Sequence, residues 1–310
     1  MKKRILAIFL CMALSMVFVG NAFARGSAQA ARPQVAIVLK TLASPYWQSV
    51  LAGAREAAAI YGFDLIELGP PSEDHVIEQI NMMEDIIARG VSGIVFAPSQ
   101  PPAAVGVLNM ARSAGIPVAV IDTPMPDGFD TFLTFIGSNN YEIGALGAQE
   151  MMRYLSAGDT VTILEGAPGN VAMTLRSDGA ENVFRANGVV IQSRQPAFSD
   201  REQAFSIMQN VLQLGPVDGV FAANDDQAVG ALLALTQNNM TAVVMGVDGN
   251  SFAIESVRDG GLFGTVAQDA AGMGFLGVQS IYRYLNNLPV ERHIDAPTPV
   301  ITRDNVTDHL

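Results

Sequence analysis

Residues 34–62 read QVAIVLKTLASPYWQSVLAGAREAAAIYG. The stretch opens with an apolar, β-branched run, which is typical of a strand that is covered on both faces. Ser44 and Pro45 then supply an N-cap residue and a first-turn proline for a helix that ends near Gly62. A buried strand followed by a helix is the repeating unit of a parallel sheet, so this stretch predicts an α/β fold.

The same alternation continues along the rest of the chain. Nine further strands are expected, at Phe63–Leu68, Gly93–Ala97, Ile116–Ile121, Leu133–Ile136, Val161–Leu164, Val189–Gln192, Val217–Phe221, Val243–Val247 and Phe263–Ala267. Helices are expected after Ser72, over Pro101–Ala114, and from near Asn139, Thr174, Asp200, Asp225, Ser251 and Asp269. About ten strands exceed what one compact doubly wound domain usually holds, so we expect two α/β lobes. No low-complexity linker separates them, which favours a hinge of short crossings.

Composition excludes several classes of protein. The chain has 310 residues, of which 49% are hydrophobic and 15% are charged, enough to bury sizeable cores. Disordered, collagen-like and small disulfide-rich proteins are therefore excluded. The net charge of −12 offers no basic surface for DNA or RNA, so no nucleic-acid partner is expected.

The N-terminus has the features of an export signal. Residues 1–4 are a short basic start, and residues 5–19 are an apolar run that is short for a membrane span. Ala22-Phe23-Ala24 provides a cleavage site, and Ala28-Gln29-Ala30 is a second candidate. We expect residues 1–24 to be a removable signal peptide, with an uncleaved membrane anchor as the alternative. Cleavage would also remove Cys11, the one cysteine of the chain.

An aromatic pair follows the first strand. Tyr46 and Trp47, the only tryptophan, stand where a helix begins at the ligand-binding edge of the expected sheet. Aromatic faces stack on the C–H surface of a sugar or on another ring, and their polar tips form hydrogen bonds. The alternative is that Trp47 packs between the two lobes.

Short polar residues follow other strands at the same edge. Carboxylates and carboxamides in a cleft are suited to hydrogen bonding of neighbouring hydroxyl groups, but Asp and Asn also cap helices. We expect Asp122, Asn224 and Asp248 to contact a ligand. We expect Asp225 and Asp269 to cap the helices that begin beside them.

Arg176 lies early in a predicted helix. A cation near a helix N-terminus interacts unfavourably with the helix dipole. We therefore expect a ligand oxygen or an acidic neighbour to hold it there.

Motifs for catalysis, nucleotides or metals are missing or misplaced. The run Gly272-Met273-Gly274-Phe275-Leu276-Gly277 matches G-x-G-x-x-G, but it lies inside a helical stretch, so it indicates close helix packing. The histidines, His75, His293 and His309, are scattered and predict no metal site. No nucleophile motif of an exported α/β hydrolase is present. The sequence therefore predicts a protein that is not an enzyme and that uses no metal or cofactor.

Several of these motifs together resemble one family. They are Val35-Ala36-Ile37-Val38 with Ser44-Pro45-Tyr46-Trp47, Gly115-Ile116-Pro117-Val118, Ile121-Asp122, Gly137-Ser138-Asn139, Phe221-Ala222-Ala223-Asn224-Asp225, Gly246-Val247-Asp248-Gly249 and Gly264-Thr265-Val266-Ala267-Gln268. In order and spacing, from about Pro33 to Asp304, the chain resembles the ribose/galactose-type periplasmic sugar-binding proteins, which are the substrate-binding components of ABC sugar importers.

The resemblance implies two Rossmann-like lobes with parallel sheets, joined by three crossings, which close on a monosaccharide without chemistry (the type I periplasmic binding protein fold). The first lobe would hold residues 31–138 plus 269–297, and the second 139–268 plus 298–310. The family's cleft residues would fall on Lys40, Ser44, Tyr46, Trp47, Asp122, Asn170, Arg176, Phe198, Asn224, Asp248 and Gln268. The local match also allows Ser199, in place of Phe198, at a stacking position.

Two departures from the ribose pattern bear on the ligand. The family often has an Asp-Arg pair where this chain has Asp122-Thr123, and Lys40 occupies a position that is small and polar in ribose binders. The resemblance therefore implies another pentose or hexose, a polyol such as inositol, or a related furanosyl signal molecule, in place of ribose bound in the usual way.

The resemblance also implies partners and a location. The protein would be a periplasmic monomer that delivers its ligand to an ABC permease and its ATPase. The alternative is a sensor that presents a sugar-like signal to a chemoreceptor or a histidine kinase.

Overall fold

The computed structural model describes residues 32–310. The expected signal peptide and its two candidate cleavage sites lie outside the described residues. Within residues 32–310, no helix combines the length and the apolar character that crossing a membrane requires.

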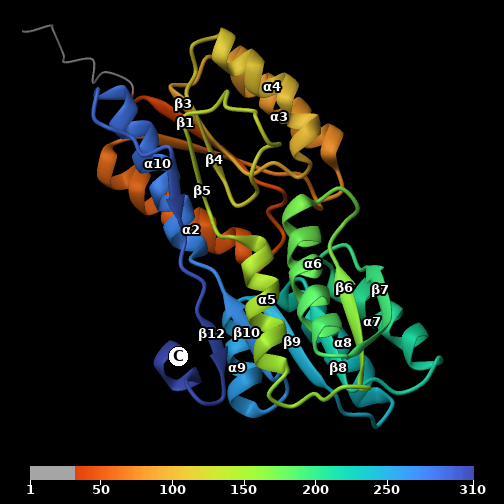
Figure 1. Ribbon diagram of the computed structural model, residues 1–310. Helices are drawn as coiled ribbons and strands as arrows, with labels where there is room; N and C mark the ends of the chain where they lie inside the picture. The colour runs from red at the N-terminus through yellow and green to blue at the C-terminus, as the bar shows by residue number, and fades with distance from the viewer. Residues whose placement is uncertain (1–31) are drawn as a thin grey trace, which may run out of the picture. The chain divides into compact units, whose positions relative to one another are not determined.

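The first sheet has six parallel strands in the order β11-β5-β4-β3-β1-β2. Its strands are β1 (Gln34–Val38), β2 (Asp64–Leu68), β3 (Gly93–Phe96), β4 (Val118–Ile121), β5 (Thr134–Gly137) and β11 (His293–Asp295). Helices α2 (Pro45–Tyr61) and α10 (Ala270–Leu285) cover one face, and α3 (Val76–Arg89) and α4 (Pro101–Ser113) cover the other (Figure 1). We call this sheet with its helices the first lobe.

The second sheet has the order β12-β10-β9-β8-β6-β7, in which only β12 runs antiparallel to its neighbour. Its strands are β6 (Thr160–Glu165), β7 (Val190–Pro196), β8 (Gly219–Ala222), β9 (Val243–Asp248), β10 (Gly264–Ala267) and β12 (Val300–Thr302). Its helices are α5 (Asn140–Met151), α6 (Val171–Ala186), α7 (Arg201–Leu212), α8 (Asp225–Gln237), α9 (Ser251–Asp259) and the short η1 (Val306–His309). We call this group the second lobe.

The chain passes between the two sheets three times. It leaves the first sheet after β5, returns after β10 through α10, and leaves again between β11 and β12. The two α/β sheets and all ten predicted strands are confirmed. The sequence did not predict β11 and β12, which are edge strands of only three residues and so are shorter than the runs that mark a strand in sequence.

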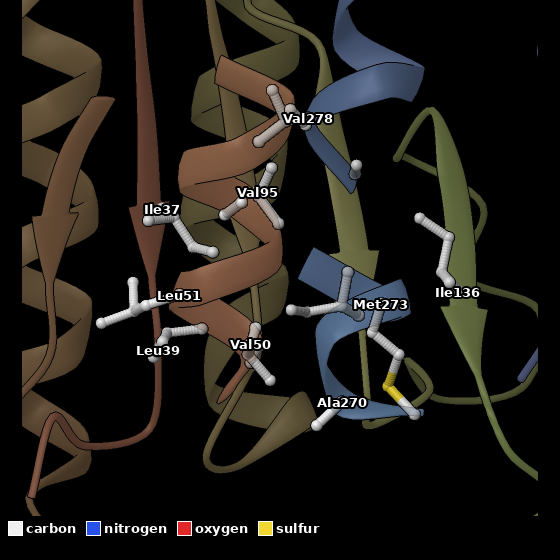
Figure 2. Packing of buried hydrophobic residues seen from close by; sticks show 14 of the residues in the cluster. Ile37, Leu39, Val50, Leu51, Val95, Ile136, Ala270, Met273 and Val278 are labelled. Carbon is white, nitrogen blue, oxygen red and sulfur yellow. The ribbon is translucent and has the colours of Figure 1, made fainter. Parts of the chain in front are cut away.

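The central strands are fixed by cores on both faces. All the residues of β3 and β4 are buried, as are the last four of β1, because helices cover the first sheet on either side. Figure 2 shows Ile37 and Val95 from this sheet packed with Val50 of α2 and Met273 of α10. This packing fixes the carboxyl ends of the strands, from which the polar residues described below project.

The predicted role of the G-x-G-x-x-G match in close helix packing is confirmed for Gly274, whereas Gly272 faces the Asp269 side chain and Gly277 faces Val95 and Ile121 of the first sheet. A Cβ at Gly274 of α10 would lie 1.9 Å from the backbone oxygen of Val50 in α2, so only glycine permits this helix crossing. We expect Gly274→Ala to lower the free energy of unfolding by about 1–3 kcal/mol, because the two helices must move apart.

Gly106 provides a matched control in α4, since it is exposed and a Cβ there would meet nothing within 4 Å. We expect Gly106→Ala to stabilise the protein by about 0.5–1 kcal/mol. Urea denaturation measures both variants. A Gly274→Ala protein as stable as the Gly106→Ala protein would show that the crossing is not constrained by glycine.

Candidate functional site

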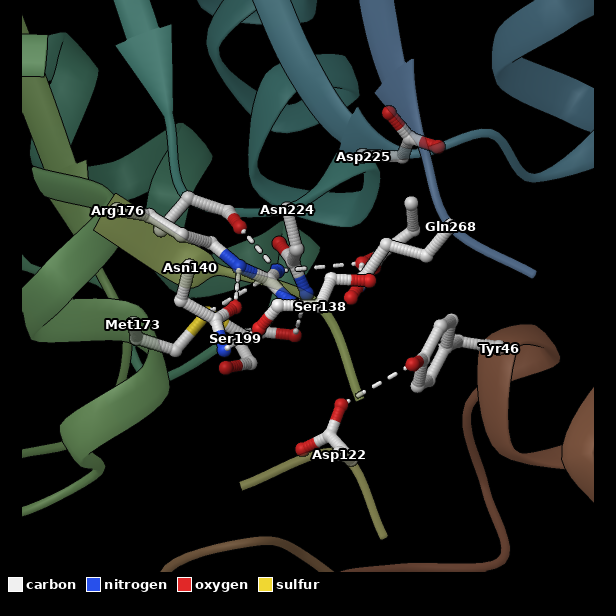
Figure 3. Close-up of polar contacts among 12 residues, drawn as sticks. Tyr46, Asp122, Ser138, Asn140, Met173, Arg176, Ser199, Asn224, Asp225 and Gln268 are labelled. Atoms are coloured by element: carbon white, nitrogen blue, oxygen red, sulfur yellow. Dashed lines mark hydrogen bonds and ion pairs between the residues drawn. The ribbon is translucent and has the colours of Figure 1, made fainter. Parts of the chain in front are cut away.

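Polar and aromatic side chains from both lobes line one cavity, which we call the inner cavity (Figure 3). Its lining residues are Lys40, Ser44, Tyr46, Trp47, Glu73, Asp122, Met173, Arg176, Asn224 and Asp248. Eight of the eleven predicted site residues are among them. The enclosed volume is about 10 Å³, close to the smallest space that holds one water molecule.

A buried ion pair forms the first-lobe wall of the inner cavity. The Lys40 ammonium donates hydrogen bonds to Asp122 Oδ2 at 2.7 Å and to Thr123 Oγ1 at 2.6 Å, and Lys40 and Asp122 are only 1% and 3% exposed. Burial on its own would raise the pKa of Asp122, but the charges of Lys40 and Arg176 and the hydrogen bonds to the carboxylate hold it below its usual value. Asp122 therefore offers a carboxylate to the cavity.

The aromatic pair lies against this carboxylate. Tyr46 donates its hydroxyl to Asp122 Oδ1 at 3.0 Å, as Figure 3 shows, and its ring meets that of Trp47 edge to face at 4.9 Å. The Lys40 ammonium lies 5.5 Å from the centre of the Trp47 ring. Ser44 occupies the N-cap position of α2, but its hydroxyl makes no capping bond, so this side chain is free to face the cavity.

Arg176 is held from three sides in the second lobe. Its Nε donates to Asn140 Oδ1 at 2.8 Å, and its Nη1 donates to the Ala223 carbonyl at 2.8 Å and to Asp248 Oδ1 at 3.2 Å. The side chain is 1% exposed. The sequence predicts that a ligand oxygen or an acidic neighbour holds Arg176 early in α6. Asp248 is that acidic neighbour, and together with two neutral acceptors it offsets the unfavourable interaction with the helix dipole.

Asp248 is the last residue of β9 and has a backbone φ of 119°, a conformation that residues other than glycine rarely adopt. Asp122, at the end of β4, has a φ of 64°. Such strain persists mainly at functional sites. Gln268 donates its Nε2 to Asp248 Oδ1 at 2.9 Å, while its own buried Oε1 accepts no hydrogen bond within residues 32–310. The site therefore contains an unsatisfied acceptor beside a carboxylate.

Burial raises the pKa of Asp248 to about 7, although Arg176 and Gln268 oppose the shift. The native protein therefore binds this proton over a pH range in which an unfolded Asp, with a pKa of about 3.9, has lost it. As the pH rises from about 4 to about 7, we expect the free energy of unfolding of the wild type to fall relative to that of Asp248→Asn, by at most about 1.4 kcal/mol per pH unit. Urea unfolding of both proteins across this range measures the difference. Parallel curves would contradict it.

The structure corrects the prediction for Asp225. The residue that caps α8 is Asn224, whose Oδ1 accepts from Gln227 N at 3.0 Å while the residue also lines the inner cavity. Asp225 is fully buried one position later and accepts from Thr265 Oγ1 and from Asn250 N. The prediction was wrong by one residue in helix register. The capping prediction for Asp269 is confirmed, since its Oδ1 accepts from Gly272 N at 2.8 Å.

The three remaining predicted residues, Asn170, Phe198 and Gln268, are not among those that line the inner cavity. Gln268 contacts Asp248, as described above. Asn170 caps α6 and donates its Nδ2 to Glu73 Oε2 at 3.2 Å. Phe198 lines a neighbouring outer cavity of about 190 Å³ and is absent from the lining of the inner one.

Two residues of the inner cavity were not predicted from the sequence. Glu73 follows the second strand, so inspection of the loop at the carboxyl end of that strand would have found it. Met173 lies one helical turn before Arg176, whose Nη1 is 3.7 Å from its sulfur, and i, i+3 spacing from Arg176 was its only sequence signal.

Comparisons with known proteins agree with this architecture. The chain matches the periplasmic binding protein domain over residues 35–289. A ribose import binding protein of Bacillus subtilis (strain 168) is 30% identical over 270 residues, which cover 87% of each chain. An ABC transporter periplasmic solute binding protein from Actinobacillus succinogenes 130z with bound D-allose superposes with a TM-score of 0.84 at 28% identity, covering 89% of this chain and 100% of its own.

A second solved structure extends the comparison to a polyol. It is an ABC transporter solute binding protein from Bacillus halodurans C-125 with bound myo-inositol, with a TM-score of 0.84 at 27% identity, covering 91% of this chain and 99% of its own. Two α/β lobes whose strand ends surround one polar cavity define a solute-binding protein. The chain belongs to the periplasmic binding protein family.

Proposed function

We propose that this protein captures a monosaccharide or a related polyol reversibly between its two lobes and delivers it to an ABC importer. One observation carries the proposal: carboxylates, cations, an amide and two aromatic rings from both lobes line the same cavity. Hydroxyl groups of a sugar would bond to Asp122, Asp248 and Arg176, and its apolar face would pack on Tyr46 and Trp47.

Capture requires the lobes to move. The inner cavity, at about 10 Å³, has room for about one water molecule and none for a monosaccharide, so a ligand enters only after the lobes separate. Because the cavity walls come from both lobes, a ligand makes all its contacts only when the lobes close, and it therefore stabilises the closed state. The unsatisfied Oε1 of Gln268 would accept a ligand hydroxyl.

The ligand differs from ribose bound in the usual way. Lys40 stands where the ribose pattern has a small polar residue, and Asp122-Thr123 stands where that pattern has an Asp-Arg pair. The Lys40 ammonium bonds to Asp122 and to Thr123, so it occupies one oxygen of the Asp122 carboxylate. The relatives bind ribose, D-allose or myo-inositol. We therefore favour another pentose, a hexose or a polyol.

The proposal includes export and delivery. The basic and apolar start of the chain supports export to the periplasm with cleavage after Ala24, and the family supports a monomer that docks on a permease with its ATPase. The first lobe would comprise residues 31–138 plus 269–297, and the second 139–268 plus 298–310. With these bounds, each of the three crossings between the sheets coincides with a lobe boundary.

A thermal-shift screen tests the function. The protein, secreted with its own N-terminal segment and purified from the periplasm, is melted with pentoses, hexoses, polyols, nucleosides and amino acids. A ligand that binds only the native state raises the melting temperature by mass action. A selective shift with one sugar or polyol is the expected result. A shift only with a nucleoside or an amino acid would overturn the ligand class.

A further inference from the structure

Glu73 joins the two lobes at the edge of the inner cavity. It lies in the loop between β2 and α3, and its Oε1 accepts from Trp47 Nε1 of the first lobe at 2.9 Å. Its Oε2 accepts from Asn170 Nδ2 and from Ser199 Oγ of the second lobe, both at 3.2 Å. One carboxylate thus binds a cavity-lining ring in one lobe and two loops of the other.

The second-lobe donors are held in place by their own loops. Asn170 uses its Oδ1 to cap α6, which leaves its Nδ2 directed at Glu73. Ser199 has a φ of 58°, a strained conformation for serine, and its carbonyl accepts from Asn224 Nδ2 at 3.4 Å. A strained backbone conformation of this kind persists only when the surrounding structure holds it in place. Both donors are therefore preorganised for an acceptor in the first lobe.

Apart from the bonds to Glu73, one other side-chain hydrogen bond joins the lobes within residues 32–310, away from the three crossing segments. It runs from Gln100 Nε2 to the Pro168 carbonyl at 3.0 Å and is exposed. The ion pairs within residues 32–310 do not include Glu73, so the direct hydrogen-bond partners of its carboxylate are neutral donors. Hydrogen bonds to a carboxylate are about twice as strong as those between neutral groups.

We propose that Glu73 is the clasp that holds the lobes closed and thereby sets how long a ligand stays bound. The inference rests on the proposed function, because it assigns to Glu73 the residence time of the captured sugar or polyol. Glu73 is a positioning residue, because it acts through Asn170, Ser199 and Trp47. Removing it favours the open state, from which the ligand leaves.

The ratio of closed to open protein tests the clasp without a ligand. Cysteines that replace the exposed Glu84 of α3 and Glu202 of α7 carry a fluorescent pair for single-molecule energy transfer, since Cys11 is expected to leave with the signal peptide. We expect Glu73→Ala to lower this ratio about 10-fold. The control Glu78→Ala removes the same charge from an exposed position nearby and should leave the ratio unchanged. Equal ratios in wild type and Glu73→Ala would overturn the proposal.

Ligand dissociation tests the pathway through Ser199. With the sugar or polyol selected by the thermal-shift screen, stopped-flow fluorescence of Trp47 gives the dissociation rate. We expect this rate to rise about 10-fold in Glu73→Ala and about 3-fold in Ser199→Ala, with the association rate within about 2-fold of wild type.

The double variant separates a clasp from a ligand contact. If Ser199 acts through Glu73, Ser199→Ala adds nothing in the Glu73→Ala background. A full additional effect there, or no effect of Ser199→Ala in the wild-type background, would overturn the proposal, because the contact between Glu73 and Ser199 would then not hold the lobes closed. If no sugar or polyol binds, the proposed function fails, while the closed-to-open ratio still decides the clasp.

Discussion

Asp248→Ala is expected to weaken binding of the sugar or polyol at least about 100-fold while the protein stays folded. Asp248 is buried at the end of β9, where it receives hydrogen bonds from Arg176 and Gln268 and faces the inner cavity. Alanine removes a carboxylate acceptor for ligand hydroxyls and leaves the Arg176 guanidinium without its anionic partner. Isothermal titration calorimetry measures the affinity, and circular dichroism verifies the fold.

Asp269→Ala is the matched control for this variant. Asp269 also follows a strand of the second sheet, but its carboxylate caps α10 and is exposed. Its removal should cost about 1 kcal/mol of stability and leave the affinity unchanged. If Asp248→Ala binds as tightly as Asp269→Ala, Asp248 has only a structural role.

Lys40→Met is expected to lower the free energy of unfolding at pH 7 by about 3–5 kcal/mol. Lys40 and Asp122 are 1% and 3% exposed and lie 2.7 Å apart, so the variant leaves a buried carboxylate with no cation in direct contact. Asp122 then keeps the hydrogen bonds from Thr123 and Tyr46, but of the two cationic charges that oppose its desolvation it loses the larger contribution and keeps only that of Arg176. Urea denaturation measures the loss.

Arg55→Met is the control for Lys40→Met. Arg55 pairs with Glu67, but these side chains are 51% and 28% exposed, so solvent screens the pair. Breaking this pair should cost less than about 1 kcal/mol. Equal losses in the two variants would show that Lys40 contributes no more than a surface charge.

The strands could be predicted because of where they lie. Parallel strands covered on both faces, such as β3 and β4, need continuous apolar runs, and these are visible in sequence. Strand β11 contains His293 and Asp295 at a sheet edge, where burial demands little of the sequence, so no pattern marks it.

The sequence predicted site residues that lie at the ends of strands, but it did not predict side chains that meet across the lobes. Asp122 follows β4 directly and Asp248 is the last residue of β9, at the edge where α/β sheets bind ligands. The sequence could not decide whether Lys40 meets a ligand or a carboxylate, because its partner Asp122 lies 82 residues away. Glu73 joins loops that are brought together only by the packing of both lobes, which no local pattern encodes.

Isothermal titration calorimetry of the periplasmic protein with the best sugar or polyol from the screen tests reversible capture most directly. We expect saturable binding at one site per chain, reversed by dialysis, with the ligand recovered chemically unchanged. No saturable heat with any pentose, hexose or polyol at millimolar concentration, or recovery of an altered sugar, would contradict it.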